Sequence, residues 1–403
     1  MSSAGGAAGG AADAAAGAAA DGAAGAAALP SPAEYLAELA SEAQIVLLGD
    51  QPGVRSHLRF LADSVPALAA AGVGNLAWDC TNTRRQADLD ELTSAAVWDD
   101  RACADLFVDL LGIGFAYREH AEVLRAVWAH NHGQPAQAGS PVRMVALGLA
   151  TYVEDPDLLD GRSAAELELR NWWMGGHYRD VAAFHGANVL ATEVLRRGER
   201  AVVYADVDLT TTRLVQWHDG LATTTTGNLL HRWMGDGVRR VVFHGVVDDP
   251  AATARVEALV EASPESGRSG AAVRFGLGLS GSTLGNVGLT KVVGSVDGSA
   301  GSLRLRDVAD GYLYLEARAQ WQPVSLLDDL LTDENLPAAE ARLRALVPRA
   351  EPYTADELER IRTEGVEQLT AQWPALPEPD PEPAGRRFGL RARRKPAGAG
   401  ESA

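Results

Sequence analysis

The stretch Ile45-Val46-Leu47-Leu48-Gly49-Asp50 predicts a buried strand, because a short apolar run that ends at a glycine and an acid is typical of one. Two further runs end in the same way, Leu76-Ala77-Trp78-Asp79 and Ala201-Val202-Val203-Tyr204-Ala205-Asp206-Val207-Asp208. Buried strands that alternate with helices form parallel sheets, and the carboxyl ends of such strands form the crevice where ligands bind. We therefore expect these acids to converge on one pocket.

The remaining pattern extends this alternation along the chain. Strands are predicted at Gln44 to Leu48, Asn75 to Trp78, Val142 to Gly148, Ala201 to Ala205 and Val238 to Phe243. Helices are predicted at Val54 to Ala71, Arg85 to Leu92, Arg101 to Leu111, Tyr117 to Asn131, Ser163 to Arg197, Ala251 to Ala262, Leu336 to Leu346 and Ala355 to Trp373. This order predicts an α/β fold, a mostly parallel sheet with helices on both faces and helical insertions.

The composition and the net charge restrict the kinds of molecule that the protein is expected to bind. A hydrophobic content of 46% with 22% charged residues is enough for a large core. A net charge of -18 argues against specific nucleic-acid binding, because a phosphate backbone requires a basic face, and it favours a small-molecule substrate or ligand. Cys80 and Cys103 alone are too few for a disulfide framework. With no signal-peptide pattern and no membrane-spanning apolar run, a cytoplasmic location is predicted.

One folded domain, residues 31–373, is expected between two disordered segments. Residues 1–30 form an Ala/Gly leader that buries no apolar bulk. Residues 374–403 start with a Pro-rich acidic stretch and continue with Arg386 to Lys395, in which six of ten residues are basic. The basic tail is interpreted either as a solvated segment or as a patch that contacts an anionic membrane or a partner. The oligomeric state is left open by the sequence.

The motifs at two strand ends resemble a known superfamily. Gly49-Asp50-Gln51-Pro52-Gly53 with His57, followed by Leu76-Ala77-Trp78-Asp79, Gln86 and Leu89-Asp90, resembles the opening of the superfamily that joins erythromycin esterase-like hydrolases, ChaN-type haem-binding proteins and Tiki metalloproteases. The strand at Ala201, and Phe275 to Gly285 with Asp310 to Leu315, resemble its later segments. The resemblance implies an α/β fold, with Glu and His residues that activate water in esterase-like members or hold a divalent metal in Tiki members.

The chain departs from this pattern at the motif histidines. Asp50 stands where the family has glutamate, Pro52 where it has histidine, and Ala205-Asp206-Val207-Asp208 where it has Gly-x-x-His. Proline can neither bind a metal nor take a proton from water. The residues that remain as catalytic candidates are Asp50, His57, Asp79 and Asp208.

Two hypotheses follow for these residues. The first is a small-molecule hydrolase of ester or amide bonds, in which repulsion between Asp50 and Asp79 raises one pKa and leaves an acid beside a base, while His57 orients water or substrate. The same carboxylates suit a divalent cation such as Mg²⁺, Mn²⁺ or Ca²⁺. The plain structural alternative is that each aspartate caps a helix or makes a turn.

The second hypothesis is a catalytically degenerate member that binds haem or another ligand without turnover. His177 and His185 lie eight residues apart on a helical pattern, share one face and are candidate cofactor ligands, although histidines at that spacing are more often surface or core residues. His218 and His244 are considered as replacements for the missing motif histidines from elsewhere in the chain. No Walker loop or dinucleotide motif is present.

Overall fold

A computed structural model describes residues 29–108, 116–133, 140–149, 181–218, 221–262, 274–289, 295–296, 303–346 and 349–374. Residues 1–28 and 375–403, which hold nearly all of the predicted leader and tail, lie outside the described residues, so the predicted domain limits stay a prediction. No helix of the described part is long and apolar enough to cross a membrane.

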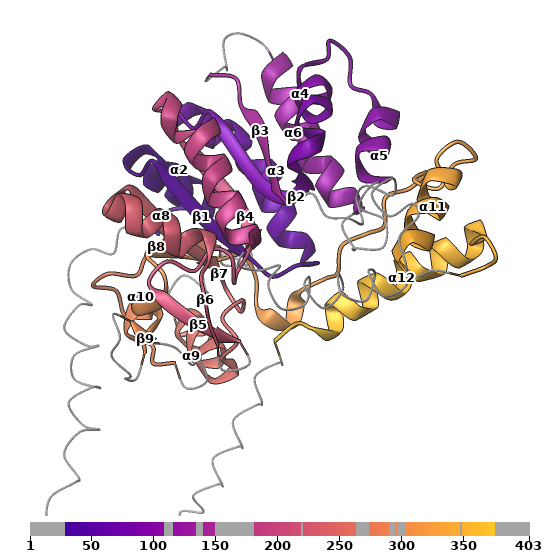
Figure 1. The fold of residues 1–403 in the computed structure, drawn as a ribbon. Helices are drawn as coiled ribbons and strands as arrows, with labels where there is room; N and C mark the ends of the chain where they lie inside the picture. Colours follow the sequence, from indigo (N-terminus) through magenta and orange to yellow (C-terminus); the bar gives the residue numbers. More distant parts are fainter. Residues whose placement is uncertain are drawn as a thin grey trace, which may run out of the picture.

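A seven-stranded sheet forms the centre of the molecule, in the order β3-β2-β4-β1-β7-β10-β8 (Figure 1). Every neighbouring pair is parallel except β10 and β8, which are antiparallel. The predicted α/β class with a mostly parallel sheet is confirmed. The strands are β1 Ile45–Asp50, β2 Asn75–Asn82, β3 Arg143–Gly148, β4 Ala201–Asp206, β7 Val238–Phe243, β8 Phe275–Gly278 and β10 Gly311–Tyr314.

A small second sheet, which was not predicted, has the order β6-β5-β9. Its strands are β5 Leu214–His218, β6 Leu221–Thr223 and β9 Ser295–Val296. The segment that contains His218 was considered only as a source of a replacement histidine. β9 lies within the Gly- and Ser-rich stretch of the chain, where side-chain patterns carry little strand signal.

The helices surround the sheet (Figure 1). They are α2 Pro32–Glu42, α3 Arg55–Ala70, α4 Gln86–Ser94, α5 Asp100–Val108, α6 Arg118–His132, α8 Thr226–Met234, α9 Pro250–Glu261, α10 Leu305–Val308, α11 Leu336–Leu346 and α12 Ala355–Ala371. Residues 181–193 are also helical. Short 3₁₀ turns lie at Thr83–Arg85, Leu195–Arg197, Gly235–Gly237, Leu284–Asn286 and Arg318–Gln320. The start of the helix predicted at Ser163 to Arg197 lies outside the described residues.

Strand alternation divides the core into two layers. Val46 and Leu48 of β1 face the larger layer, where they pack with Leu61 of α3 and Val123 of α6. Ile45 and Leu47 belong to the opposite layer, where they pack with Leu190 of the helical segment 181–193, with Val194 in the turn after it and with Leu230 of α8. Successive side chains of a strand point to opposite faces, so one apolar run supplies both layers. The predicted helices on both faces are therefore present.

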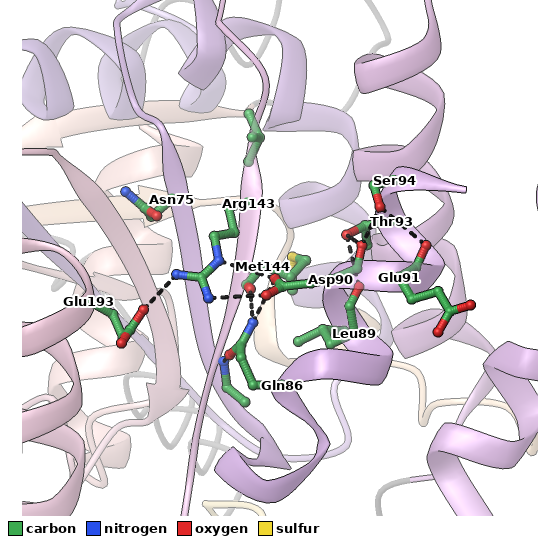
Figure 2. Close-up of polar contacts among 12 residues, drawn as sticks. Asn75, Gln86, Leu89, Asp90, Glu91, Thr93, Ser94, Arg143, Met144 and Glu193 are labelled. Atoms are coloured by element: carbon green, nitrogen blue, oxygen red, sulfur yellow. Dashed lines mark hydrogen bonds and ion pairs between the residues drawn. The ribbon is translucent and has the colours of Figure 1, made fainter. Parts of the chain in front are cut away.

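The outer edge of β3 is closed by a side chain instead of a strand. The Gln86 side chain donates from Nε2 to the Met144 carbonyl at 2.9 Å and accepts from the Ala146 amide at 2.8 Å. Figure 2 shows the surrounding ion pairs, in which the Arg143 guanidinium contacts both oxygens of Asp90 and also Glu193. The Gln86 amide thus takes the place of a neighbouring strand. Gln86 and Asp90 belong to the superfamily-like motif, and here their contacts are structural.

Candidate functional site

The acids that end the strand runs meet at the carboxyl end of the sheet. Asp50 is the last residue of β1 and Asp206 the last of β4, and their Cα atoms are partners in the parallel pairing. Asp79 lies on β2, the other neighbour of β4. Three adjacent strands therefore bring three carboxyl groups to the same end of the sheet.

His57 forms a buried pair with Asp50. The Nδ1 atom of His57 lies 2.6 Å from Oδ1 of Asp50, and the two residues are 1% and 6% exposed. The turn after β1 places His57 in the first part of α3, and Gly53 makes this turn possible with a φ of 83°. The imidazole stacks on Phe243 with ring centroids 4.0 Å apart and meets the edge of Trp321 at 5.2 Å. The predicted proximity of Asp50 and His57 is thus present as a direct contact.

Burial favours the uncharged form of this pair. It lowers the pKa of His57 to about 3 and raises the pKa of Asp50 well above its usual value. The arrangement that satisfies both groups is a protonated Asp50 that donates to a neutral imidazole. The phenol of Tyr204 lies beside Asp50, and burial raises the phenol pKa, so its hydroxyl also stays protonated.

Asp79, Asp206 and Asp208 line one cavity, which we call the acidic pocket. It measures about 270 Å³, and the rest of its wall is mainly apolar: Leu47, Leu147, Leu149, Ala182, Val203, Ala205 and Leu209, with Gly148, Gly186, Thr210 and Thr226. Backbone amides fix two of the acids, since Asp206 N–H donates to Oδ2 of Asp79 at 3.3 Å and Asp208 N–H to Oδ1 of Asp206 at 2.7 Å. Asp50 is not part of this wall; it lies on the side of His57.

The two amide-fixed carboxyls have pKa values near neutrality. Burial raises the pKa of Asp79 to about 6. Burial also raises the pKa of Asp206 to about 7, and the charges of Asp208 and Asp79 add to it. Like charges that share a desolvated site retain protons at neutral pH. The pocket therefore presents two carboxyls that can gain or lose a proton near neutral pH.

The predicted cofactor ligands receive no support from the described residues. His177 lies outside the described residues. His185, in the helical segment 181–193, is half-buried and its Nε2 lies 3.3 Å from the Thr83 hydroxyl oxygen. Within the described ranges no group of three or more His, Cys, Asp or Glu side chains has an arrangement suited to a metal ion. The haem and metal expectations thus stay predictions.

His244, considered as a replacement histidine, follows β7 and is buried. Its Nδ1 lies 2.7 Å from the Tyr312 hydroxyl and its Nε2 lies 3.0 Å from Oε1 of Glu257, so both ring nitrogens are engaged. Burial lowers its pKa, with an opposing contribution from Glu257. His244 therefore serves as a fixed polar link between β7, β10 and α9.

Asp206 is the site residue that the sequence interpretation left out. Asp208 was chosen from the same run, yet Asp206 ends β4 and pairs with Asp50. The available signal was position, because Asp206 is the first acid after the apolar run. The aromatic rings of Phe243 and Trp321, which contact His57, were also missed by the sequence interpretation, since they come from distant parts of the chain.

Comparisons with known proteins found similarities to solved structures only, at low sequence identity. No family model matches the chain, and no curated protein matches it. Among solved structures, a Bacillus cereus protein has a TM-score of 0.48 at 12% identity and covers 73% of this chain and 92% of its own. A succinoglycan biosynthesis protein has 0.48 at 10%, with 72% and 91% covered. ChaN of Campylobacter jejuni, solved with cofacial haem, has 0.27 at 11%, with 52% and 84% covered.

ChaN is one of the protein types that the sequence motifs resemble, but similarities at these identities and TM-scores carry no argument about activity or ligand. The class that the fold and the site define is an α/β protein with a mostly parallel sheet and an acidic pocket at the strand carboxyl ends.

Proposed function

We propose that this protein is a hydrolase that cleaves an ester or amide bond of a small molecule bound in the acidic pocket. The observation that carries the proposal is that Asp79 and Asp206, from neighbouring strands, line the same mainly apolar cavity. A volume of about 270 Å³ is at the lower end of the range for small-molecule sites, which favours a small substrate. The motifs that resemble erythromycin esterase-like hydrolases agree with this reaction class.

In the proposed reaction Asp79 is the general base and Asp206 the general acid. The ionised Asp79 takes a proton from water as the water oxygen attacks the carbonyl carbon, and the protonated Asp206 gives its proton to the leaving oxygen or nitrogen. General acid–base catalysis is most efficient when the pKa values lie near the working pH. The pKa values of about 6 and about 7 for Asp79 and Asp206 meet this condition in the assigned order.

Asp50 lies on the strand next to that of Asp206 but outside the wall of the acidic pocket. The sequence hypothesis gave Asp50 the role of acid or base, whereas the pocket wall contains Asp206 in its place. The imidazole of His57 holds the Asp50 carboxyl in position, and the Asp50 carbonyl accepts a hydrogen bond from the Val207 amide, next to Asp206, at 2.8 Å. We therefore assign Asp50 and His57 a positioning role.

A panel of small esters and amides tests the proposal with the full-length protein. Asp79→Asn and Asp206→Asn are each expected to lower kcat/KM by about 10²-fold or more, the usual contribution of a general acid or base. Asp236→Asn is the matched control, because Asp236 is exposed and pairs only with the surface residue Arg239 in the described part of the chain. Turnover of a substrate that survives both pocket substitutions would exclude this assignment.

Ligand binding without turnover is the second candidate. It is favoured by the mainly apolar wall of the acidic pocket and by Pro52, which stands at a motif histidine position. In this case the purified protein binds a small apolar or haem-type ligand but hydrolyses no member of the panel. A haem Soret band, or mass spectrometry of a co-purified compound, distinguishes this outcome from the hydrolase.

A further inference from the structure

Arg240 is a buried cation that lies outside the wall of the acidic pocket. It belongs to β7, its side chain is 4% exposed, and burial lowers its pKa to about 10. The two hydrogen bonds of its guanidinium within the described residues go to main-chain carbonyls, from Nη1 to Val308 at 2.6 Å and from Nη2 to Val207 at 2.8 Å. Its Nε atom has no hydrogen-bond partner in that part of the chain.

Val207 lies between the two acids Asp206 and Asp208, and its carbonyl receives three donors. They are Nη2 of Arg240 and the hydroxyls of Thr210 and Thr211, at 2.8, 2.9 and 3.3 Å. On the other side, the Val207 amide donates to the Asp50 carbonyl at 2.8 Å. The peptide units around Val207 are thus held by β1 and by β7 at once.

The surroundings leave this turn little freedom. A Cβ atom on Gly49 would lie 2.7 Å from the Thr210 hydroxyl oxygen, and one on Gly227 would lie 2.5 Å from the Thr211 carbonyl oxygen. Arg240 itself is anchored, since its backbone amide donates to Asp310 at 2.8 Å and its carbonyl accepts from the Asp310 amide at 2.8 Å. Asp310 in turn bonds to Arg213 at 2.6 Å.

We propose that Arg240 is a positioning residue that fixes the Asp206–Asp208 turn and so sets the direction of the two carboxyls in the acidic pocket. The catalytic consequence rests on the proposed function, but the positioning does not. A buried guanidinium bonded to carbonyls is costly to fold, and an apolar residue would remove that cost. The hydrogen bond from Arg240 to the Val207 carbonyl shows what this cation does in the fold: it holds the turn next to the pocket.

The guanidinium also contributes charge. Asp208, Asp310 and Asp206 all act on the Arg240 pKa, so the cation lies within electrostatic range of both turn acids. Removing it is expected to make ionisation of Asp206 less favourable. Replacing arginine by lysine keeps the charge but provides a single ammonium in place of the fork that reaches two carbonyls.

The test compares Arg240→Met and Arg240→Lys with the control Arg239→Met in the full-length protein without substrate. Arg239 is the preceding residue on β7 and forms a surface pair with Asp236. Amide hydrogen exchange at Asp208 and Thr210, and ¹³C titration of the Asp206 carboxyl, are the two measurements. Arg240→Met is expected to speed exchange at both amides at least tenfold and to raise the Asp206 pKa by at least half a unit. Arg240→Lys is expected to speed exchange at least threefold without the pKa change.

Arg240→Met behaviour equal to that of Arg239→Met in both measurements would overturn the proposal. If Arg240→Met does not fold, Arg240→Lys decides: faster exchange at Asp208 and Thr210 supports the role, and unchanged exchange refutes it. Neither measurement needs a substrate. A lack of hydrolysis by the wild type, together with the expected exchange, would reject the proposed function and leave the role of Arg240 standing.

Discussion

Asp50 and Asp206 are direct partners in the parallel pairing of β1 and β4, so the two carboxyls start from positions on strands about 4.8 Å apart. Their side chains lie in different environments. Asp50 binds His57 in a closed aromatic environment, whereas Asp206 lines the acidic pocket with Asp79. The pairing of Asp50 with Asp206 therefore places the buried Asp50–His57 contact next to the acidic pocket, where we propose that hydrolysis takes place.

The plot of kcat/KM against pH should be bell-shaped and narrow. Asp79 must be ionised, which requires a pH above about 6, and Asp206 must be protonated, which requires a pH below about 7. The kcat/KM of the wild type on its best substrate is expected to peak near neutral pH and to fall on both sides. Asp206→Asn should remove the alkaline limb along with most of the rate. A profile that stays flat from pH 5 to pH 9 contradicts the assignment.

The unfolding free energy should respond to pH through the same acids. A carboxyl whose pKa is raised in the folded state contributes stability below its unfolded pKa, and this contribution is lost as the pH rises through its folded pKa. For Asp206 the loss extends from about pH 4 to pH 7. As the pH is raised from 5 to 8, the unfolding free energy of Asp206→Asn should therefore rise relative to that of the wild type, by roughly 1–2 kcal/mol after allowance for partial solvent contact. Urea unfolding of both proteins at pH 5 and at pH 8 measures this change, with Asp236→Asn as the control.

Substitutions at the His57 pair should reveal its protonation state. His57→Ala removes the stacking on Phe243 and leaves the Asp50 carboxyl without its imidazole, an expected loss of about 2–4 kcal/mol. Asp50→Asn keeps a donor for a neutral imidazole and should cost about 1 kcal/mol or less. A loss of about 3–5 kcal/mol in Asp50→Asn would instead indicate a buried ion pair. Urea unfolding at pH 7, with His132→Ala on the exposed side of α6 as reference, provides the comparison.

The edge of β3 should depend on one amide side chain. Gln86→Ala removes the hydrogen bond to the Met144 carbonyl, drawn in Figure 2, and the one from the Ala146 amide, and is expected to cost about 1–2 kcal/mol. Hydrogen exchange at the Ala146 amide should accelerate, since that group is left without its partner. Gln368→Ala, on an exposed position of α12, is the matched control. Equal stability of the two variants would show that water replaces the Gln86 amide without loss.

The sequence was sufficient to predict the fold class and most of the elements. The run that begins at Ile45 and the run at Val238 appear as the strands β1 and β7 within two residues of their predicted ends. Such runs are short, apolar and buried on both sides, which makes their signal strong. β8 lies in the segment Phe275 to Gly285, which was singled out only by its resemblance to the superfamily, and its antiparallel pairing depends on a distant partner, β10.

The sequence predicted an acidic site at the strand ends, but it did not identify all of the residues that form it. Asp50, His57 and Asp79 follow from the strand-end rule and from the motif. The choice between Asp206 and Asp208 depends on where β4 ends, and strand ends are uncertain by about two residues in a sequence. The separation of Asp50 from the pocket wall, and the contact of Arg240 with Val207, arise from side-chain direction and long-range packing, which no local pattern encodes.

A ¹³C titration of the aspartate carboxyls measures whether Asp79 and Asp206 share one desolvated pocket. We expect titration near pH 6 for Asp79 and near pH 7 for Asp206, and a lower Asp206 pKa in Asp79→Asn, where one neighbouring charge is absent. Two independent titrations near pH 4, with Asp206 unaffected by the substitution at Asp79, would contradict this expectation.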